Sequence, residues 1–200
     1  LNIGIIGAGL MGHEHIQNFN LLDGARIGAI ADTNAAMLAK ALELSDTDAR
    51  TSHDYETLLS DDSLDALVIA TPNFHHIDVL RAALSTGKPI LCEKPLCTTL
   101  DDCREITDLV ATRPPEQVIW MGLEYRYMPP PQRLMAEIAA GTTGDVKMVA
   151  IREHRFPFLV KVDNWNRFSK NTGGTLVEKC CHFFDLMIQA TASRPVRVMA

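Results

Sequence analysis

NIGIIGAGLMG, at residues 2–12, is the stretch that decides the fold of this 200-residue chain. It joins an isoleucine-rich run, typical of a buried parallel strand, to the spacing G-x-G-x-x-G and then to a helical pattern over residues 13–22. In this spacing Gly7 allows a tight turn, Gly9 lets the backbone approach a pyrophosphate, and Gly12 lets the helix pack closely on the strand. The N–H groups of the first helical turn would face the phosphates. The stretch therefore predicts a dinucleotide site, although a strand–turn–helix that holds no nucleotide has the same outline.

An acidic residue follows the next buried strand. Residues 26–31, RIGAIA, lead to Asp32, which stands twenty residues after Gly12. A carboxylate there can accept hydrogen bonds from the adenosine ribose hydroxyls, and its charge would repel a 2′-phosphate. We therefore expect NAD rather than NADP, while noting that Asn34 is neutral and that nearby arginines could accommodate a phosphate.

Strands and helices then alternate. Apolar runs at residues 64–70, 89–92 and 118–121 predict three further strands. Helical patterns precede or separate these strands at residues 34–44, 54–59, 75–85 and 100–112. This alternation predicts an α/β fold with a doubly wound parallel sheet, whose ligands bind at the carboxyl ends of the strands. Two turns follow these strands at that edge: Thr71-Pro72-Asn73 and Glu93-Lys94-Pro95.

The pattern changes after Gly122. An aromatic, proline-rich linker at residues 125–131 precedes an expected helix (132–140), a strand (147–155), a loop (156–171), a helix (176–190) and the start of a strand (196–199). Two strands and two helices do not close a domain. We therefore expect a nucleotide-binding domain at residues 1–122 and, at residues 123–200, the first part of a second α/β domain that continues beyond the sequence.

Composition limits the classes of partner. The net charge of −6 argues against nucleic acid or an anionic membrane, and no run approaches the eighteen or so apolar residues of a membrane span. The apolar beginning lacks the basic segment of a signal peptide. The five cysteines are odd in number and two are adjacent, which does not suit a disulfide framework and indicates a reducing cytoplasm.

Lys94 is the first candidate for chemistry. It follows a strand and precedes a proline, which favours an extended conformation. An ammonium held near a nicotinamide could bind a substrate oxygen and stabilise developing alkoxide charge. A surface lysine in a turn would have the same local sequence.

Glu178 and His182 are the second candidate. At a spacing of i, i+4 on one helix they would share a face, with Asp185 three residues further on. A carboxylate can orient an imidazole and support its protonated form, which suits a general base that removes a hydroxyl proton. An ordinary helical Glu–His pair is the alternative.

Other reactive side chains lack a functional pattern. His13, His15 and the pair His75-His76 have no recognised metal-ligand spacing, so no metal is expected. The pair Cys180-Cys181, beside His182, is better explained by packing than by a thiol nucleophile.

Taken in this order, the glycine motif, Asp32, the Thr-Pro-Asn and Glu-Lys-Pro turns, and the element from Gly173 through His182 to Asp185 resemble the Gfo/Idh/MocA oxidoreductases. The resemblance spans nearly the whole chain. It implies an N-terminal Rossmann domain and a C-terminal α/β domain with a large open sheet, which often mediates dimers or tetramers. It also implies oxidation or reduction at a hydroxyl-bearing carbon of a sugar or cyclitol.

The resemblance assigns roles to individual residues. Lys94 matches the family's catalytic lysine and His182 its catalytic histidine, while Glu178 stands where aspartate is usual and Cys180 where glycine is common. The implied cofactor-binding residues are Gly7, Ala8, Gly9, Leu10, Met11, Gly12, Asp32, Thr71, Pro72, Asn73, His76, Glu93 and Lys94. Candidate substrate contacts, chosen by position, are Tyr125, Arg126, Trp165, Arg167 and Asp185.

The sequence thus predicts an NAD-dependent oxidoreductase that acts on a polyhydroxylated small molecule and forms a homodimer or homotetramer. Two alternatives stay open. One is a non-catalytic nucleotide-binding sensor, which is known in the same family. The other is a redox-neutral glycosidase that oxidises its substrate transiently with bound NAD.

Overall fold

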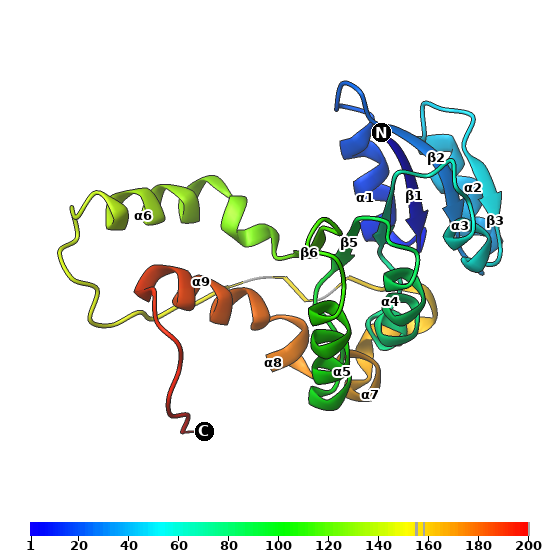
Figure 1. Ribbon diagram of the computed structural model, residues 1–200. Coiled ribbons are helices and arrows are strands. Elements are labelled where there is room, and N and C mark those ends of the chain that lie inside the picture. Colours follow the sequence, from blue (N-terminus) through cyan, green and yellow to red (C-terminus); the bar gives the residue numbers. More distant parts are fainter. Residues whose placement is uncertain (155, 158, 200) are drawn as a thin grey trace.

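A computed structural model describes residues 1–154, 156–157 and 159–199 (Figure 1). Its centre is a six-stranded, wholly parallel sheet of order β3-β2-β1-β4-β5-β6. The strands are β1 (Asn2–Ile6), β2 (Arg26–Ala31), β3 (Arg50–Ser52), β4 (Ala66–Ile69), β5 (Ile90–Glu93) and β6 (Ile119–Gly122). The helices that connect them are α1 (Leu10–Phe19), α2 (Ala35–Leu44), α3 (Glu56–Leu59), η1 (Asn73–His75), α4 (His76–Leu84) and α5 (Leu100–Ala111). The predicted doubly wound parallel sheet is confirmed.

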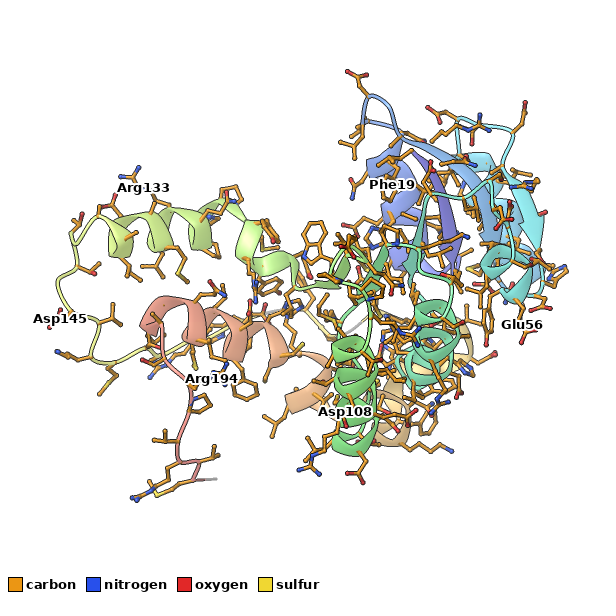
Figure 2. All side chains as sticks on the ribbon, in the orientation of Figure 1. Phe19, Glu56, Asp108, Arg133, Asp145 and Arg194 are labelled. Atoms are coloured by element: carbon orange, nitrogen blue, oxygen red, sulfur yellow. The ribbon has the colours of Figure 1, made fainter. Side chains whose placement is uncertain are left out.

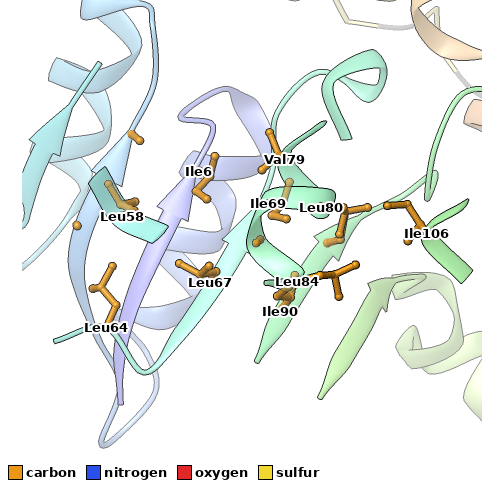
Figure 3. Close-up of a cluster of buried hydrophobic side chains, with 14 of the residues drawn as sticks. Ile6, Leu58, Leu64, Leu67, Ile69, Val79, Leu80, Leu84, Ile90 and Ile106 are labelled. Carbon is orange, nitrogen blue, oxygen red and sulfur yellow. The ribbon is translucent and has the colours of Figure 1, made fainter. Parts of the chain in front are cut away.

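Both faces of the sheet are covered, which explains the continuous apolar strands. On one face α1 and α2 contribute Ile16 and Leu38 to a cluster with the buried isoleucines of β1 and β2. On the other face α4 and α5 contribute Leu80 and Ile106 to a second cluster, drawn in Figure 3. The two layers hold the carboxyl ends of β1, β2, β4 and β5 side by side at one edge.

The edge strand β3 was not among the predicted strands. Its three residues, Arg50, Thr51 and Ser52, are polar and are half-buried or exposed. Such a short strand has no apolar run from which it could be predicted. It forms because its backbone pairs with that of β2, from Ala29↔Arg50 to Ala31↔Ser52.

One part of the second region extends away from the sheet, and another part returns to the carboxyl edge of the sheet (Figure 1). Its elements are η2 (Glu124–Tyr127), α6 (Pro129–Ala139), η3 (Val162–Arg167), α7 (Ser169–Thr172), α8 (Thr175–Glu178) and α9 (Cys181–Thr191). Helix α6 packs against α9. Side chains are densest around the sheet and sparser along α6 and the segment that follows it (Figure 2).

Four expectations for this region were wrong. Residues 147–154 form no strand, nor do residues 196–199, because no neighbouring strand in the described part offers backbone partners; Arg155, the last residue of the expected 147–155 strand, lies outside the described residues. The expected loop at 156–171, of which Phe158 is also outside them, contains η3 and begins α7. The expected helix at 176–190 is broken at Lys179 (φ −112°, ψ −48°), so α8 and α9 are separate helices.

Within the described residues, every helix is too short or too polar to cross a lipid bilayer.

Candidate functional site

A cavity of about 820 Å³ lies at the carboxyl edge of the sheet. Its walls come from the β1–α1 turn, the end of β2, the β4–η1 turn, the end of β5 and the segment at residues 160–165. This is the edge at which the sequence predicted a dinucleotide.

The glycine turn has the geometry that the motif requires. Gly7 has φ +98°, and a Cβ there would lie 2.5 Å from the carbonyl carbon of Ala70. A Cβ on Gly12 would lie 2.0 Å from the carbonyl oxygen of Gly7, so α1 can approach β1 only without a side chain. Gly9 lines the cavity, and nothing stands within 4 Å of the position of its missing Cβ. No side chain caps the start of α1, so its first N–H groups are available to a phosphate.

Asp32 is fixed beside this turn. Its Oδ2 accepts a hydrogen bond from the Ala8 N–H at 2.7 Å, and its Oδ1 accepts one from the Asn34 N–H at 2.8 Å. Asp32 also lines the cavity. Each carboxylate oxygen has a further lone pair, so the side chain can still accept hydrogen bonds from ribose hydroxyls.

Two polar atoms on the cavity wall suit a bound ligand. The Oγ1 of Thr71 and the Nδ2 of Asn73 are buried and have no hydrogen-bond partner in the described structure. Buried polar groups are normally paired, so these two atoms fit a cofactor that satisfies them. Pro72 and Met11 also line the cavity.

His76 occupies a different position. The side chain is fully buried and outside the cavity wall, with Nδ1 2.7 Å from the Pro95 carbonyl oxygen and Nε2 3.1 Å from that of Thr71. Burial lowers its pKa. His76 therefore ties the two turns that follow β4 and β5 together.

Glu93 and Lys94 line the cavity and belong to a second group of charged side chains. Glu93 Oε1 lies 2.8 Å from His15 Nε2, and Lys94 Nζ donates a hydrogen bond to the main-chain oxygen of Glu178 at 3.3 Å. The Lys94–Pro95 peptide bond is cis. Lys94 therefore lines the cavity and contacts the segment that contains Glu178.

Lys161 is a site residue that the sequence did not single out. It lines the same cavity, with its ammonium 4.7 Å from the ring centroid of Trp165, which is another wall residue. Burial, and then the charge of Lys94, lower the pKa of Lys161, while Glu178 and Glu93 raise it. The only available signal was its place four residues before Trp165 in a polar loop.

His182 is 1% exposed and lies within electrostatic reach of Lys94. Its Nε2 is 3.5 Å from Glu124 Oε1, its buried Nδ1 has no partner among the described residues, and its ring stacks on that of Tyr125. Burial, followed by the charges of Lys94 and Lys179, lowers its pKa to about 4. The imidazole is thus neutral near pH 7.

Glu178 does not share a helix with His182, because α8 ends at Glu178. Its side chain is buried, and no hydrogen bond joins its carboxylate to the imidazole in the described structure. The carboxylate near His182 belongs instead to Glu124, which the sequence did not single out.

The candidate substrate residues divide into three groups. Arg126 and Asp185 bind each other, with Arg126 Nε 2.6 Å from Asp185 Oδ2, and Tyr125 lies on His182. Trp165 lines the cavity, 6.2 Å from the ring centroid of Phe74. Arg167 is exposed and outside the cavity wall.

In the described part of the chain, no three His, Cys, Asp or Glu side chains converge in a way that could hold a metal ion.

Two family models match the chain. The Gfo/Idh/MocA model described as "Oxidoreductase family, NAD-binding Rossmann fold" matches residues 1–119. Its companion, described as "Oxidoreductase family, C-terminal alpha/beta domain", matches residues 136–189.

Individual relatives agree with these matches. The chain is 32% identical to inositol 2-dehydrogenase of Corynebacterium glutamicum strain ATCC 13032, over 99% of this chain and 56% of the relative. It is 29% identical to the uncharacterized oxidoreductase YrbE of Bacillus subtilis strain 168, over 98% and 55%. The crystal structure of myo-inositol dehydrogenase from Lactobacillus casei in complex with NAD(H) and myo-inositol superposes with a TM-score of 0.77 at 26% identity, over 96% and 54%. The chain therefore spans about half the length of the proteins it matches.

Proposed function

The chain belongs to the Gfo/Idh/MocA oxidoreductase family, and on that premise we propose that the protein transfers hydride between a hydroxyl-bearing carbon and the nicotinamide of NAD. The substrate class is a sugar, a cyclitol or a related polyol. Similarity to proteins named inositol 2-dehydrogenase supports this class.

One contact carries the proposal. The hydrogen bond from Lys94 Nζ to the Glu178 main-chain oxygen joins the end of the cavity to the segment that leads to His182. A substrate beside Lys94 would therefore lie between the cofactor edge of the sheet and the candidate base.

The three predicted catalytic residues then have distinct roles. Lys94 binds the reacting oxygen and stabilises its developing negative charge. His182, which is neutral near pH 7, takes the hydroxyl proton. Glu178 supplies a carboxylate beside the lysines, since its charge raises the pKa of Lys161. A bound NAD would supply the hydride acceptor.

NAD is the proposed cofactor, and the charges along the cavity support it. Asp32 is held by two backbone N–H groups at the adenosine end, where its charge disfavours a 2′-phosphate. The lysines on the described cavity wall are Lys94 and Lys161, and both are grouped with Glu93 and Glu178. The wall contains no arginine among these residues.

Three wider expectations belong to the same proposal. We place the domain boundary at residue 122, with the NAD-binding domain at residues 1–122. Assembly into a homodimer or homotetramer through a C-terminal sheet stays a prediction, and so does a cytoplasmic location.

The test mixes the full-length protein and NAD with a panel of sugars, cyclitols and sugar acids, and follows NADH absorbance. Formation of NADH with a polyol is the expected result. No NADH from any compound, with NADH still bound tightly, would overturn the proposal in favour of a sensor or a redox-neutral glycosidase. Isotope exchange at a glycoside carbon would then separate those two.

A further inference from the structure

We propose that Glu124 is the proton-relay partner of His182: it takes the proton that the imidazole removes from the substrate and passes it to water. The inference rests on the proposed function, because oxidation of an alcohol releases one proton in each turnover. It assigns a role to a residue that the sequence did not single out.

The position of Glu124 supports this role. Glu124 follows β6 at the edge of the sheet that holds Lys94, and it begins η2. Its Oε1 lies 3.5 Å from His182 Nε2. The segment from 120 to 135 lies between the two family-model matches, so the family models do not supply this residue.

Exposure differs sharply between the two side chains. The His182 side chain is 1% exposed, whereas that of Glu124 is 48% exposed. A proton on the imidazole has no direct route to water, but Glu124 contacts the imidazole and the solvent. The carboxylate is thus placed as the exit.

The two nitrogens of the His182 imidazole also have different surroundings. Nε2 faces Glu124, and Nδ1 is buried without a partner in the described structure. Nε2 is therefore the nitrogen that can exchange a proton with Glu124, and a neutral imidazole with its proton on Nδ1 leaves the Nε2 lone pair free to act as the base.

Each proton in the proposed relay has a defined donor and acceptor. The substrate C–H bond breaks with hydride leaving to NAD⁺, and the O–H bond breaks with its proton passing to His182 Nε2. The Nε2–H bond of the resulting imidazolium then breaks, and that proton goes to Glu124 Oε1 and afterwards to water. Loss of this proton returns the imidazole to its neutral form, with its remaining proton on Nδ1.

Burial shifts the pKa values of the two groups in opposite directions, and charged neighbours modify both shifts. Lys94 and Lys179 oppose protonation of His182, while Glu93 and Asp185 favour it. Burial and Glu93 raise the pKa of Glu124, against the opposing effect of Lys94 and Lys179, whereas the pKa of His182 falls to about 4. A carboxylate whose pKa is raised is a better acceptor for the proton of an imidazolium whose pKa is lowered.

The kinetic test uses E124Q in the full-length protein, because glutamine keeps the shape and removes the proton acceptor. We expect kcat for alcohol oxidation to fall about tenfold or more in dilute buffer. We expect small buffer bases such as imidazole to restore it in proportion to their concentration, with NADH affinity unchanged. The matched control is E116Q, an exposed glutamate outside the cavity wall. Unchanged kcat in E124Q, or a loss that buffer does not restore, would overturn the relay.

A second measurement does not need turnover. In protein labelled with ¹⁵N-histidine, with His182 assigned from an H182Q spectrum, we expect the Nδ1–H tautomer and, in E124Q, a titration shifted to lower pH. An unchanged His182 titration would overturn the pairing whatever the activity. A wild type that turns over no polyol would overturn the proposed function, while this titration would still decide the pairing.

Discussion

The imidazole of His182 lies flat on the ring of Tyr125, with centroids 4.2 Å apart and planes inclined by 12°. The Tyr125 hydroxyl is held in turn by the ammonium of Lys179 and by Glu153 Oε1, the latter at 2.9 Å. One aromatic plane therefore sets the orientation of the candidate base.

Replacing Tyr125 separates stacking from hydrogen bonding. Tyr125→Phe keeps the ring, so we expect kcat to fall by less than about threefold, whereas Tyr125→Ala removes a contact worth about 0.5–1.5 kcal/mol and frees the imidazole to rotate. We expect a larger loss of kcat than of KM in the alanine variant. Steady-state kinetics check this, and equal kcat values for the two variants would contradict a role for the ring.

Replacing His182 tests the base itself. His182→Ala should lower turnover at least about a hundredfold, because general-base catalysis contributes that much or more. Affinity for NADH should hold, since His182 is outside the cavity wall. Gln189→Ala, at an exposed position on the same helix, is the control. Turnover that survives in His182→Ala would remove the histidine from the mechanism.

The glycine turn offers a contrast between fold and binding. Gly9 has φ −77° and open space around its missing Cβ, so Gly9→Ala should change the free energy of unfolding by less than about 0.5 kcal/mol. The added methyl group would project into the cavity and weaken NADH binding. Gly12→Ala should instead destabilise the fold, because its Cβ would lie 2.0 Å from the Gly7 carbonyl oxygen. Urea unfolding and NADH fluorescence titration measure both effects, and full NADH affinity in Gly9→Ala would argue against the phosphate site.

Asp32 should set the choice of cofactor. Asp32→Asn removes the charge that repels a 2′-phosphate, so we expect the preference for NAD over NADP to fall by about tenfold, or about 1.4 kcal/mol. Dissociation constants for both cofactors give the ratio. Asp23→Asn, in an exposed loop, should leave the ratio unchanged. An unaltered ratio in Asp32→Asn would mean that another group discriminates.

The buried imidazole should make stability depend on pH. The pKa of His182 is about 4 in the folded protein, below the ordinary value of 6.5, so the unfolded chain gains its proton first as the pH falls. Stability from this group is complete above pH 6.5 and declines toward pH 4, by on the order of 2 kcal/mol at pH 5. Urea unfolding at pH 7 and pH 5 should show a larger decline in the wild type than in His182→Gln. Equal declines would show that the imidazole titrates normally.

The sheet and its ligand-binding edge could be predicted from sequence because local patterns encode them. Isoleucine-rich strands, the glycine spacing and Asp32 each occupy a few consecutive positions. The polar edge strand β3 could not be predicted, because its partner on β2 defines it.

Contacts between distant segments of the chain bring together the charged side chains near Lys94. Glu124 meets His182 only because η2 packs against α9, and Lys161 meets Lys94 only because its segment returns to the sheet edge. The spacing of Glu178 and His182 suggested one helix face, but the chain bends at Lys179, whose ammonium ion-pairs with Glu153. The roles of the catalytic residues and the domain boundary remain predictions.

The order of the sheet also governs how the chain can fold. β1 lies in the middle of the sheet, between β2 and β4. Its pairing with β4, in which Ile3 lies opposite Ala66, joins segments that are far apart in the sequence. All pairings are parallel, so no hairpin can form early, and such non-local topologies fold slowly. During synthesis the apolar β1 emerges well before β4, and one of its edges stays open in the meantime. We therefore expect early translation intermediates to aggregate readily and to depend on chaperones.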